Sequence, residues 1–474
     1  MSGIKAYSAY IPFYRIKKSE ISTQFGKGAK KGERAVAYWD EDSLTMAVAA
    51  SMEAAKNSSK ENIGAVYFAS TTSPYMEKQC ATQIAACLGL GLNVRTADYA
   101  ASLRCAADAM LAANDFAATG KDAVAAVGDC RMGAADGSFE MDLGDGGAAF
   151  VFGSDKVIAE VKGSYSAAMD FHDMWRADDD KYVRFWDVRF GIVAHYEPMV
   201  KEAVSNLLKQ AGLTSADITS FVSYAHEDRY RLSVAAQLGF TPEQIPAAMY
   251  NEIGNTGAAM APQLLARVLD TAKPGDKIVY AGYGDGCTAI LLEVTDEILH
   301  YCRESTVESK LLHKNSDITY GKYVKWKDSL QMEPQRRPDQ ERASLPDYFR
   351  NYRKNTAMYG SKCRRCGQPQ FPAQRVCACC HTWDEMDPYC FLGVKASIRT
   401  FTLDGLALSK DSPNFLVVVG FDGGGKMMTY LVDCKREDIR VGMPVELSFR
   451  KIFKQNGVQT YFWKVVPATE KEGA

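Results

Sequence analysis

The chain has 474 residues, of which 47% are hydrophobic and 24% charged, and its formal net charge is −2. These values are ordinary for a soluble globular protein of two to four domains, and the low charge excludes a global attraction to nucleic acid or an anionic membrane. No apolar run approaches the roughly 20 residues that span a bilayer, and the N-terminus lacks the pattern of a signal peptide. We therefore expect a cytoplasmic protein with no membrane or nucleic-acid partner.

Residues 1–295 alternate apolar, β-rich runs with Ala-rich, helical ones. Examples in chain order are IGAVYFAS, ATQIAACLGL, DAVAAVGDC, DITSFVSYA and DKIVYAGYGDG. This alternation is typical of α/β folds. Strands that are apolar on both faces indicate a sheet covered by helices on each side.

One stretch, TADYAASLRCAADAM, places Cys105 at the predicted start of an Ala-rich helix. Unpaired backbone N–H groups and the positive end of the helix dipole favour a thiolate there, which is the nucleophilic form of cysteine. The alternative is a small buried cysteine that packs the helix against a sheet. This stretch alone does not distinguish a nucleophilic cysteine from a structural one, so the rest of the sequence is needed.

An internal repeat links the two halves of this region. Each half contains, in the same order, the end of a helix, a short turn, a buried strand and a GDG motif. In the first half the segments are ATGKDAVAAVGDC and LGDGGAAFVFG, and in the second half the segment is AKPGDKIVYAGYGDGCTAILLEV. Counting back from each turn reaches a helix start, with Cys105 in the first half and Asn255 in the second. Two halves related by a pseudo-twofold axis would bring both helix starts to one central site. We therefore predict a nucleophile on one helix and an amide on the other.

A histidine, His226, lies between an apolar strand and an amphipathic helix in ITSFVSYAHEDRYRLSVAAQLGF. The carboxyl ends of strands in α/β sheets are where ligands tend to bind. The alternative is a surface or capping histidine.

The C-terminal part differs in composition. Residues 297–360 are rich in charged side chains, and we expect a linker there with one helix. Residues 361–390 contain two Cys-x2-Cys pairs separated by ten residues, which is the spacing of a tetrahedral zinc site. Cys379 and His381 are alternative candidates for the fourth ligand. Four thiolates would make the zinc structural. The predicted ligands are Cys363, Cys366, Cys377 and Cys380.

The tail, residues 391–474, contains about five β-rich runs, which indicates a small barrel such as an OB-fold. OB-folds often bind nucleic acid, but these residues include only 12 basic against 9 acidic side chains. The electrostatic footprint of nucleic-acid binding is therefore weak.

Together these residues resemble the thiolase superfamily and, within it, the 3-hydroxy-3-methylglutaryl-CoA synthase family of archaeal type. The tail resembles the zinc-ribbon/OB-fold family that accompanies such enzymes, usually as a separate subunit. The segments that carry the likeness are IKAYSAYIPFYRIKKSEI, the Cys105 stretch, LGDGGAAFVFG, DFHDMWRADDDKYVRFWDVRFG, the His226 stretch, IGNTGAA and KPGDKIVYAGYGDG.

The resemblance implies a duplicated, five-layered αβαβα fold in a homodimer or higher oligomer. Its halves would be residues 1–160 and 161–296, followed by the charged linker 297–360, a zinc ribbon over 361–390 and an OB-fold over 391–474. The tail would hold or shield a coenzyme A ester and mediate assembly, which includes binding to a thiolase-family partner subunit.

The resemblance also assigns roles to residues. Cys105 would accept the acyl group, His226 would polarise a thioester or acceptor carbonyl, and Asn255 would hydrogen-bond in the site. Tetrahedral intermediates need donors for a developing oxyanion, and the turn Gly284–Gly286 is a candidate for them.

One position departs from the family. The synthases have a Glu general base where FASTTSPYMEKQC places Thr71, and a hydroxyl cannot deprotonate a thioester methyl as a carboxylate can. Three replacements are conceivable: Glu77, the acids Glu227 and Asp228 that follow the histidine, and Cys287 in the GDGC turn. The alternative interpretation of Glu227 and Asp228 is that they are surface acids, and that of Cys287 is a buried structural thiol.

We therefore predict an acyl-CoA enzyme that makes or breaks a carbon–carbon bond through a cysteine acyl-enzyme. The alternatives are a hydroxymethylglutaryl-CoA synthase with a relocated base, and a non-catalytic scaffold subunit of a thiolase complex. The expected ligands are structural Zn²⁺ and a coenzyme A thioester as substrate.

Overall fold

The computed structural model describes residues 2–333, 344–406 and 409–468. It contains two compact units, which we describe separately: the first combines Met1–Tyr38 with Asp42–Tyr323, and the second combines Trp39–Glu41 with Val324–Ala474. Among the described residues, no helix has both the length and the apolar character needed to cross a membrane.

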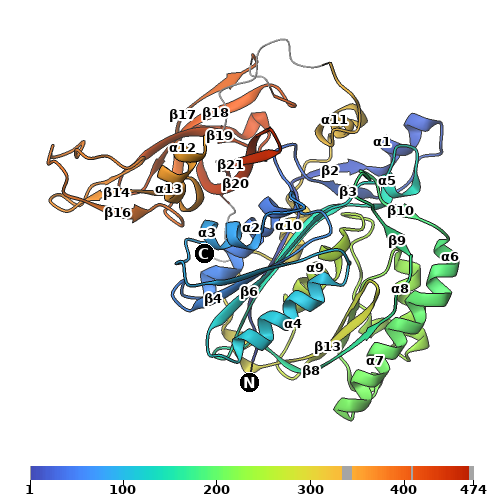
Figure 1. Ribbon diagram of the computed structural model, residues 1–474. Coiled ribbons are helices and arrows are strands. Elements are labelled where there is room, and N and C mark those ends of the chain that lie inside the picture. Colours follow the sequence, from blue (N-terminus) through green and yellow to red (C-terminus); the bar gives the residue numbers. More distant parts are fainter. Residues whose placement is uncertain (1, 334–343, 407–408, 469–474) are drawn as a thin grey trace. The chain divides into compact units, whose positions relative to one another are not determined.

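The first unit is organised around one mixed, nine-stranded sheet in the order β11-β12-β13-β8-β1-β7-β6-β4-β5. Figure 1 labels β4, β6, β8 and β13 of this sheet. Its strands are β1 (Gly3–Tyr10), β4 (Ile63–Ala69), β5 (Arg95–Tyr99), β6 (Asp122–Cys130), β7 (Asp145–Gly153), β8 (Ala159–Ala168), β11 (Ser220–Ser223), β12 (Lys277–Tyr283) and β13 (Gly286–Val294).

The sheet is built from a repeated arrangement of strands. In the first half β1 pairs antiparallel with β7, β7 antiparallel with β6, and β6 parallel with β4. In the second half β8, β13, β12 and β11 repeat this order with the same directions. The halves join where β1 pairs with β8 at Gly3–Glu160 and Ile4–Ala159. The predicted duplication is therefore confirmed.

Four helices divide into outer and central positions. The outer helices each contact one half only: α2 (Ser43–Ala54) contacts β1, β6 and β7, and α7 (Glu197–Ala211) contacts β8, β12 and β13. The central helices contact both halves: α4 (Cys105–Ala117) contacts β4, β6, β7, β12 and β13, and α9 (Met260–Leu269) contacts β1, β7, β11 and β12. The layers therefore run helix, strands, helices, strands, helix, which confirms the predicted αβαβα architecture.

Small side chains allow the central helix α4 to lie between the strands. Cys105, Ala106, Ala107, Ala109 and Ala113 are all buried on it. On the facing strand β12, a Cβ added to Gly282 would come within 2.9 Å of the Ala107 Cβ. Larger residues would separate the layers, so the Ala-rich composition follows from the close packing of this helix.

Shorter elements complete the first unit. These are α1 (Lys18–Ser22), η1 (Thr23–Phe25), β2 (Tyr14–Lys17), β3 (Glu33–Val36), η2 (Ala55–Asn57), α3 (Ala81–Cys87), α5 (Ser138–Asp142), β9 (Met174–Trp175), β10 (Arg184–Phe185), α6 (Val188–Gly191), the π-helix η3 (Ile192–Tyr196), η4 (Ser215–Asp217), α8 (Asp228–Gln237), η5 (Pro242–Gln244), η6 (Gly257–Ala259), η7 (Asp296–His300) and α10 (Val307–Leu312).

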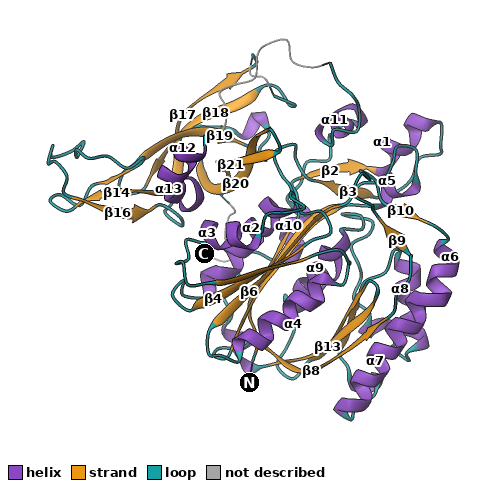
Figure 2. Cartoon of the chain, viewed as in Figure 1, coloured by secondary structure: helices purple, strands orange, loops and turns teal. Residues whose placement is uncertain are grey.

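The second unit contains a small sheet and a barrel (Figure 2). The sheet has the order β15-β14-β16, and the closed five-stranded barrel has the order β17-β18-β19-β21-β20, as expected of an OB-fold. The bounds are β14 (Tyr359–Cys363), β15 (Pro369–Gln370), β16 (Met386–Cys390), β17 (Ala396–Asp404), β18 (Asn414–Phe421), β19 (Lys426–Leu431), η8 (Arg436–Asp438), β20 (Pro444–Gln455) and β21 (Val458–Pro467).

The short segment Trp39–Glu41 belongs to the second unit through buried ion pairs. Asp40 is fully buried, and its carboxylate lies 2.7 Å from Lys464 Nζ and 3.2 Å from Arg450 Nη1. Burial alone would raise the pKa of Asp40, but these two cations outweigh it and lower the pKa below its usual value.

The expected linker 297–360 is more helical than its charge indicates. It includes α10, α11 (Tyr320–Trp326), α12 (Leu345–Arg350) and α13 (Tyr352–Ala357). In α11, Tyr323 and Trp326 are buried although lysines surround them in sequence, because residues three apart share one face of a helix. Most of the charged run QMEPQRRPDQERAS falls on residues 334–343, outside the described residues.

Candidate active site

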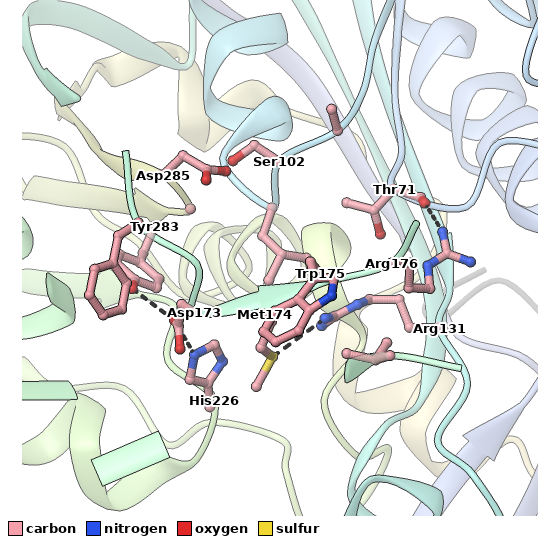
Figure 3. Close-up of a pocket in the computed structure, with 15 residues that line it drawn as sticks. Thr71, Ser102, Arg131, Asp173, Met174, Trp175, Arg176, His226, Tyr283 and Asp285 are labelled. Atoms are coloured by element: carbon pink, nitrogen blue, oxygen red, sulfur yellow. Dashed lines mark hydrogen bonds and ion pairs between the residues drawn. The ribbon is translucent and has the colours of Figure 1, made fainter. Parts of the chain in front are cut away.

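A cavity of about 130 Å³ opens in the first unit (Figure 3). Its walls come from segments that are far apart in sequence: the turn Ala101–Leu103, residues within Phe171–Arg176, His226, and the loop Tyr283–Asp285. The lining also includes Thr71, Arg131 and Val183. The fold thus brings the turn before Cys105 in the first half together with His226 and the GDG loop of the second half.

Cys105 is the first residue of α4, where the sequence predicts it. Its backbone N–H donates to the Ser102 carbonyl at 3.1 Å, and the residue is 2% exposed. It lies two residues beyond Leu103 but is not itself among the lining residues. The turn Ala101–Leu103 therefore stands at the cavity wall, whereas the sulfur is covered by protein.

The environment of Cys105 does not favour a thiolate. Burial raises the pKa of its thiol well above the ordinary value, and the carboxylates of Asp129 and Asp108 raise it further. Hydrogen bonds from the backbone N–H groups of Ala106 and Cys105 lower the pKa, as a helix N-terminus should. Removal from water therefore disfavours the anion more than the helix start favours it.

Asp129, at the end of β6, is a site residue that sequence reasoning missed. It is fully buried and accepts hydrogen bonds from Thr71 Oγ1 at 2.8 Å, Thr72 Oγ1 at 2.6 Å and the Ala258 N–H at 3.0 Å. A carboxylate therefore stands beside the Thr71 position at which the sequence lacks a Glu. An acid at the end of an apolar strand was the available signal.

The replacements considered for the missing Glu do not line the cavity. Glu77 and Glu227 are exposed, and Glu227 pairs with a surface arginine at 2.9 Å. Asp228 lies 2.8 Å from the buried Arg231. Cys287 is fully buried in β13, where burial raises the pKa of its thiol to about 12.

His226 lines the cavity as one member of a hydrogen-bonded group (Figure 3). Its Nε2 lies 2.7 Å from Asp173 Oδ2, the same oxygen that accepts from the Tyr283 hydroxyl at 2.9 Å, and its Nδ1 lies 3.4 Å from the Tyr224 hydroxyl. Burial would raise the pKa of Asp173, but the hydrogen bonds from His226 and Tyr283 lower it overall. An ionised Asp173 stabilises the imidazolium that forms when His226 takes up a proton.

A second histidine extends this group into the core. His195 is fully buried in the π-helix η3, and its Nδ1 lies 2.7 Å from the Tyr283 hydroxyl. Phe171 stacks on its ring with centroids 4.9 Å apart. Neither Asp173 nor His195 stood out in the sequence, because no periodic pattern marks the loop and the π-helix that carry them.

Asn255 lies next to His226 but behind the cavity wall. Its Nδ2 donates to the His226 carbonyl at 3.0 Å and to the Tyr224 hydroxyl at 3.2 Å, and its Oδ1 accepts from the Gly257 N–H at 3.0 Å. The side-chain amide therefore fixes the backbone of His226. It also joins that backbone to η6, which contacts α4, the helix that begins at Cys105.

The GDG loop packs closely against the turn that precedes Cys105. Gly284 has a φ of +157°, and a Cβ added there would lie 2.6–2.9 Å from atoms of Ser102, Leu103 and Arg104. Glycine is therefore required at this approach. The Gly284 N–H already donates to the Gly286 carbonyl at 2.9 Å, so this structure does not present it as an oxyanion donor.

Four cysteines of the second unit form a cluster. Their sulfur atoms all lie within 4.8 Å of one another, with 3.6 Å between Cys363 and Cys380 and 3.5 Å between Cys366 and Cys377. Four thiolates around one zinc ion, each at about 2.3 Å, place their sulfurs about 3.8 Å apart, so the arrangement fits a tetrahedral site. Cys379 and His381 are not members of the cluster.

Two regions of the chain match known domain families. Residues 208–294 match the C-terminal domain of 3-oxoacyl-[acyl-carrier-protein] synthase III, and residues 392–450 match the C-terminal OB-fold domain of ChsH2. The second match confirms the predicted OB-fold.

Curated relatives cover the first part of the chain. The chain is 32% identical over 346 residues to a hydroxymethylglutaryl-CoA synthase of Methanopyrus kandleri, a match that spans 69% of this chain and 97% of the relative. It is 32% identical over 333 residues to the synthase of Pyrococcus horikoshii, which spans 68% and 95%.

Solved structures share the fold at lower identity. MvaS in complex with 3-hydroxy-3-methylglutaryl coenzyme A superposes with a TM-score of 0.60 and 18% identity over 69% of this chain and 91% of that one. 3-Oxoacyl-(acyl carrier protein) synthase III, FabH, from Pseudomonas aeruginosa PAO1 superposes with a TM-score of 0.57 and 18% identity over 62% and 98%.

Proposed function

The chain belongs to the hydroxymethylglutaryl-CoA synthase family, and on this premise we propose that it transfers acyl groups from coenzyme A thioesters through an acyl-enzyme on Cys105. The members of this family are acyltransferases of the thiolase superfamily, and their chemistry is a Claisen-type condensation of acyl-CoA. The reaction that we propose here makes or breaks the bond between an acyl carbonyl and the α-carbon of a second acyl-CoA.

In the first step the Cys105 sulfur attacks the thioester carbonyl of the first substrate. A carbon–sulfur bond forms to the enzyme, the bond to coenzyme A breaks, and the leaving thiolate takes up a proton. Because burial raises the pKa of Cys105, the thiol has to lose its proton as substrate binds. The imidazole of His226, paired with Asp173, is the proton acceptor that lines the cavity.

In the second step the α-carbon of another acyl-CoA loses a proton and attacks the acyl carbonyl on Cys105. The new carbon–carbon bond forms as the sulfur leaves. In the opposite direction a β-ketoacyl-CoA is cleaved, and coenzyme A then removes the acyl group. Both directions need a proton acceptor, and the His226–Asp173 pair serves in each.

The observation that carries this proposal is the composition of the cavity wall. The turn before Cys105, His226 and the GDG loop come from both halves of the duplicated fold, and all three line one cavity. A scaffold subunit with a degenerate site has no physical need to keep a buried His–Asp pair at that wall, because such a pair stabilises little by itself.

Synthesis of hydroxymethylglutaryl-CoA with a relocated base is the second candidate. The specific observation in its favour is the carboxylate of Asp129 at 2.8 Å from Thr71 Oγ1, beside the place of the missing Glu. The two candidates can be separated by incubating the protein with acetyl-CoA and acetoacetyl-CoA and following coenzyme A release and the product by mass spectrometry. Formation of hydroxymethylglutaryl-CoA by the wild type, and its loss in Asp129→Asn, would favour the synthase.

For the second unit we propose a structural zinc ion held by Cys363, Cys366, Cys377 and Cys380. Four thiolates leave no open coordination position, so the metal would supply stability and no chemistry. We further propose a cytoplasmic homodimer, with a thiolase-family subunit as a further partner.

The test is covalent labelling of Cys105. Intact-mass spectrometry after incubation with acetyl-CoA should show an added acetyl group on the wild type and none on Cys105→Ala. Cys287→Ala is the matched control, since it removes an equally buried thiol from the same unit and should leave the adduct in place. An unlabelled wild type, or an adduct that persists in Cys105→Ala, would overturn the proposal.

A further inference from the structure

Arg131 is a buried arginine in the wall of the cavity. It is 5% exposed, and its Nη2 donates to the Met174 sulfur at 3.5 Å, a thioether that accepts hydrogen bonds only weakly (Figure 3). Its Nη1 has no hydrogen-bond partner among the described residues. The Tyr224 hydroxyl also interacts with this side chain. The hydrogen-bond partners of the guanidinium are thus neutral groups and one of its nitrogens has none, so it is suited to a ligand that brings an anionic acceptor.

The same wall carries a second positive charge. Arg176 lines the cavity, and one of its Nη atoms donates to the Thr71 carbonyl. Burial lowers the pKa of Arg176, the nearby charge of Asp129 raises it, and the charge of Arg131 lowers it, which indicates that the two guanidinium groups are close. Among the acids of the lining, Asp173 is bound to His226 and Asp285 is exposed. Asp129 contributes negative charge from outside the lining, but its oxygens are hydrogen-bonded to Thr71 and Thr72.

The size and the other walls of the cavity limit the ligand. A cavity of about 150 Å³ in another protein accommodates a benzene ring, so 130 Å³ suits a group of about that size. Phe171, Trp175 and Val183 provide apolar surface for methylene groups. A guanidinium pairs best with a carboxylate, because its two parallel N–H groups match the two oxygens.

We propose that the acyl group transferred by this protein carries a second, free carboxylate, and that Arg131 binds it. The substrate class is then the short ω-carboxyacyl thioesters of coenzyme A, such as the monothioester of a four-carbon dicarboxylic acid. This inference rests on the proposed acyl transfer to Cys105 and adds the identity of the acyl group.

The experiment compares two thioesters with the same number of chain carbons, succinyl-CoA and butyryl-CoA. Rates of Cys105 acylation are followed by intact mass and by coenzyme A release. The wild type should prefer succinyl-CoA, and Arg131→Gln should lower the ratio of the two rates by about 10- to 100-fold. Arg131→Lys keeps the charge but loses the paired N–H groups, so it should restore part of the ratio.

A matched control is Arg231→Gln, which removes another buried arginine with an unpartnered Nη1 outside the cavity lining. It should leave the ratio as in the wild type. A ratio that Arg131→Gln does not change, or an equal loss with both thioesters, would overturn the inference, because an arginine that binds the phosphates of coenzyme A acts on every thioester alike.

A binding measurement separates failure of this inference from failure of the acyl transfer. In the Cys105→Ala protein no acyl-enzyme forms, yet succinate should raise the unfolding temperature more than butyramide, which has the same number of carbons but no carboxylate, at the same concentration. The difference should vanish when Arg131→Gln is added. If butyryl-CoA labels Cys105 but succinate shows no such effect, the carboxylate site is refuted while the proposed function stands. If succinate binds through Arg131 but no thioester labels Cys105, the acyl transfer fails and the anion site remains.

Discussion

Cysteine occurs in two contrasting environments in this protein. In the second unit four sulfurs from two Cys-x2-Cys pairs lie within 4.8 Å of one another. In the first unit the sulfur of Cys105 is buried at the start of α4, and the nearest influences on its charge are the carboxylates of Asp129 and Asp108. One environment gathers four sulfurs in an arrangement that fits a metal ion, whereas the other buries a single thiol beside two carboxylates, which raises the pKa of that thiol.

The difference shows that the chemistry of a cysteine side chain can be set by local backbone geometry in one place and by tertiary structure in another. A Cys-x2-Cys knuckle sets the approach of its two sulfurs by local backbone geometry, so the spacing alone indicates the chemistry. The charge state of Cys105 depends on carboxylates that are distant in sequence and on the depth of burial, and neither is local. The following predictions test this contrast.

The largest effect is expected from Cys363→Ser. It removes one of the four proposed metal ligands. Zinc contributes about 10–16 kcal/mol to the folding of small zinc domains, so the sheet that carries the cysteine cluster should unfold. Calorimetry should show loss or broadening of one transition, and metal analysis should show loss of zinc. Cys379→Ser, at an exposed cysteine outside the cluster, should match the wild type. Zinc retained in Cys363→Ser, or absent from the wild type, would contradict the metal site.

Asp173→Asn should slow acylation of Cys105 by about 10²- to 10⁴-fold. The amide keeps the shape but no longer stabilises the imidazolium of His226, which it contacts at 2.7 Å. The rate is measured by coenzyme A release in a single turnover. Asp170→Asn changes an exposed acid of the same segment and should have no comparable effect. A change of less than threefold for Asp173→Asn would remove the pair from the mechanism.

The reactivity of Cys105 in the free protein should rise with pH. Burial raises the pKa of its thiol above the ordinary value, so below that pKa the thiolate fraction increases about tenfold for each pH unit. Alkylation by iodoacetamide, followed on the Cys105 peptide by mass spectrometry, should therefore climb steadily from pH 7 to 9. A plateau that begins below pH 8 would mean a low pKa and would restore the thiolate that the helix start alone predicts.

The smallest effect is expected from Asp108→Asn. Removing one of the two carboxylates that raise the Cys105 pKa should speed its alkylation at pH 8 by about two- to fivefold. The effect is small because the Asp108 side chain is 36% exposed and pairs with Arg104. Asp115→Asn, an exposed acid further along the same helix, should leave the rate unchanged. Slower alkylation in Asp108→Asn would show that this carboxylate acts through structure and not through charge.

Features that depend on local pattern could be predicted from the amino-acid sequence. Alternating apolar runs and the repeated GDG turns gave the duplicated α/β architecture, and the Cys-x2-Cys spacing gave the four sulfurs that cluster. The starts of α4 and of the segment after β11 were also predictable, because Ala-rich periodicity and the end of an apolar strand mark them along the chain. In these cases the physical cause lies within a few residues of the feature.

The surroundings of the functional side chains could not be predicted in this way, because they are set by the three-dimensional fold. Asp129 contacts Thr71, Asp173 contacts His226, and Arg131 reaches the cavity because strands and loops far apart in sequence meet at one edge of the sheet. Burial raises the pKa of the Cys105 thiol, whereas the start of its own helix lowers that pKa. Desolvation and distant charges depend on where the whole chain places a group, and no local pattern contains that information.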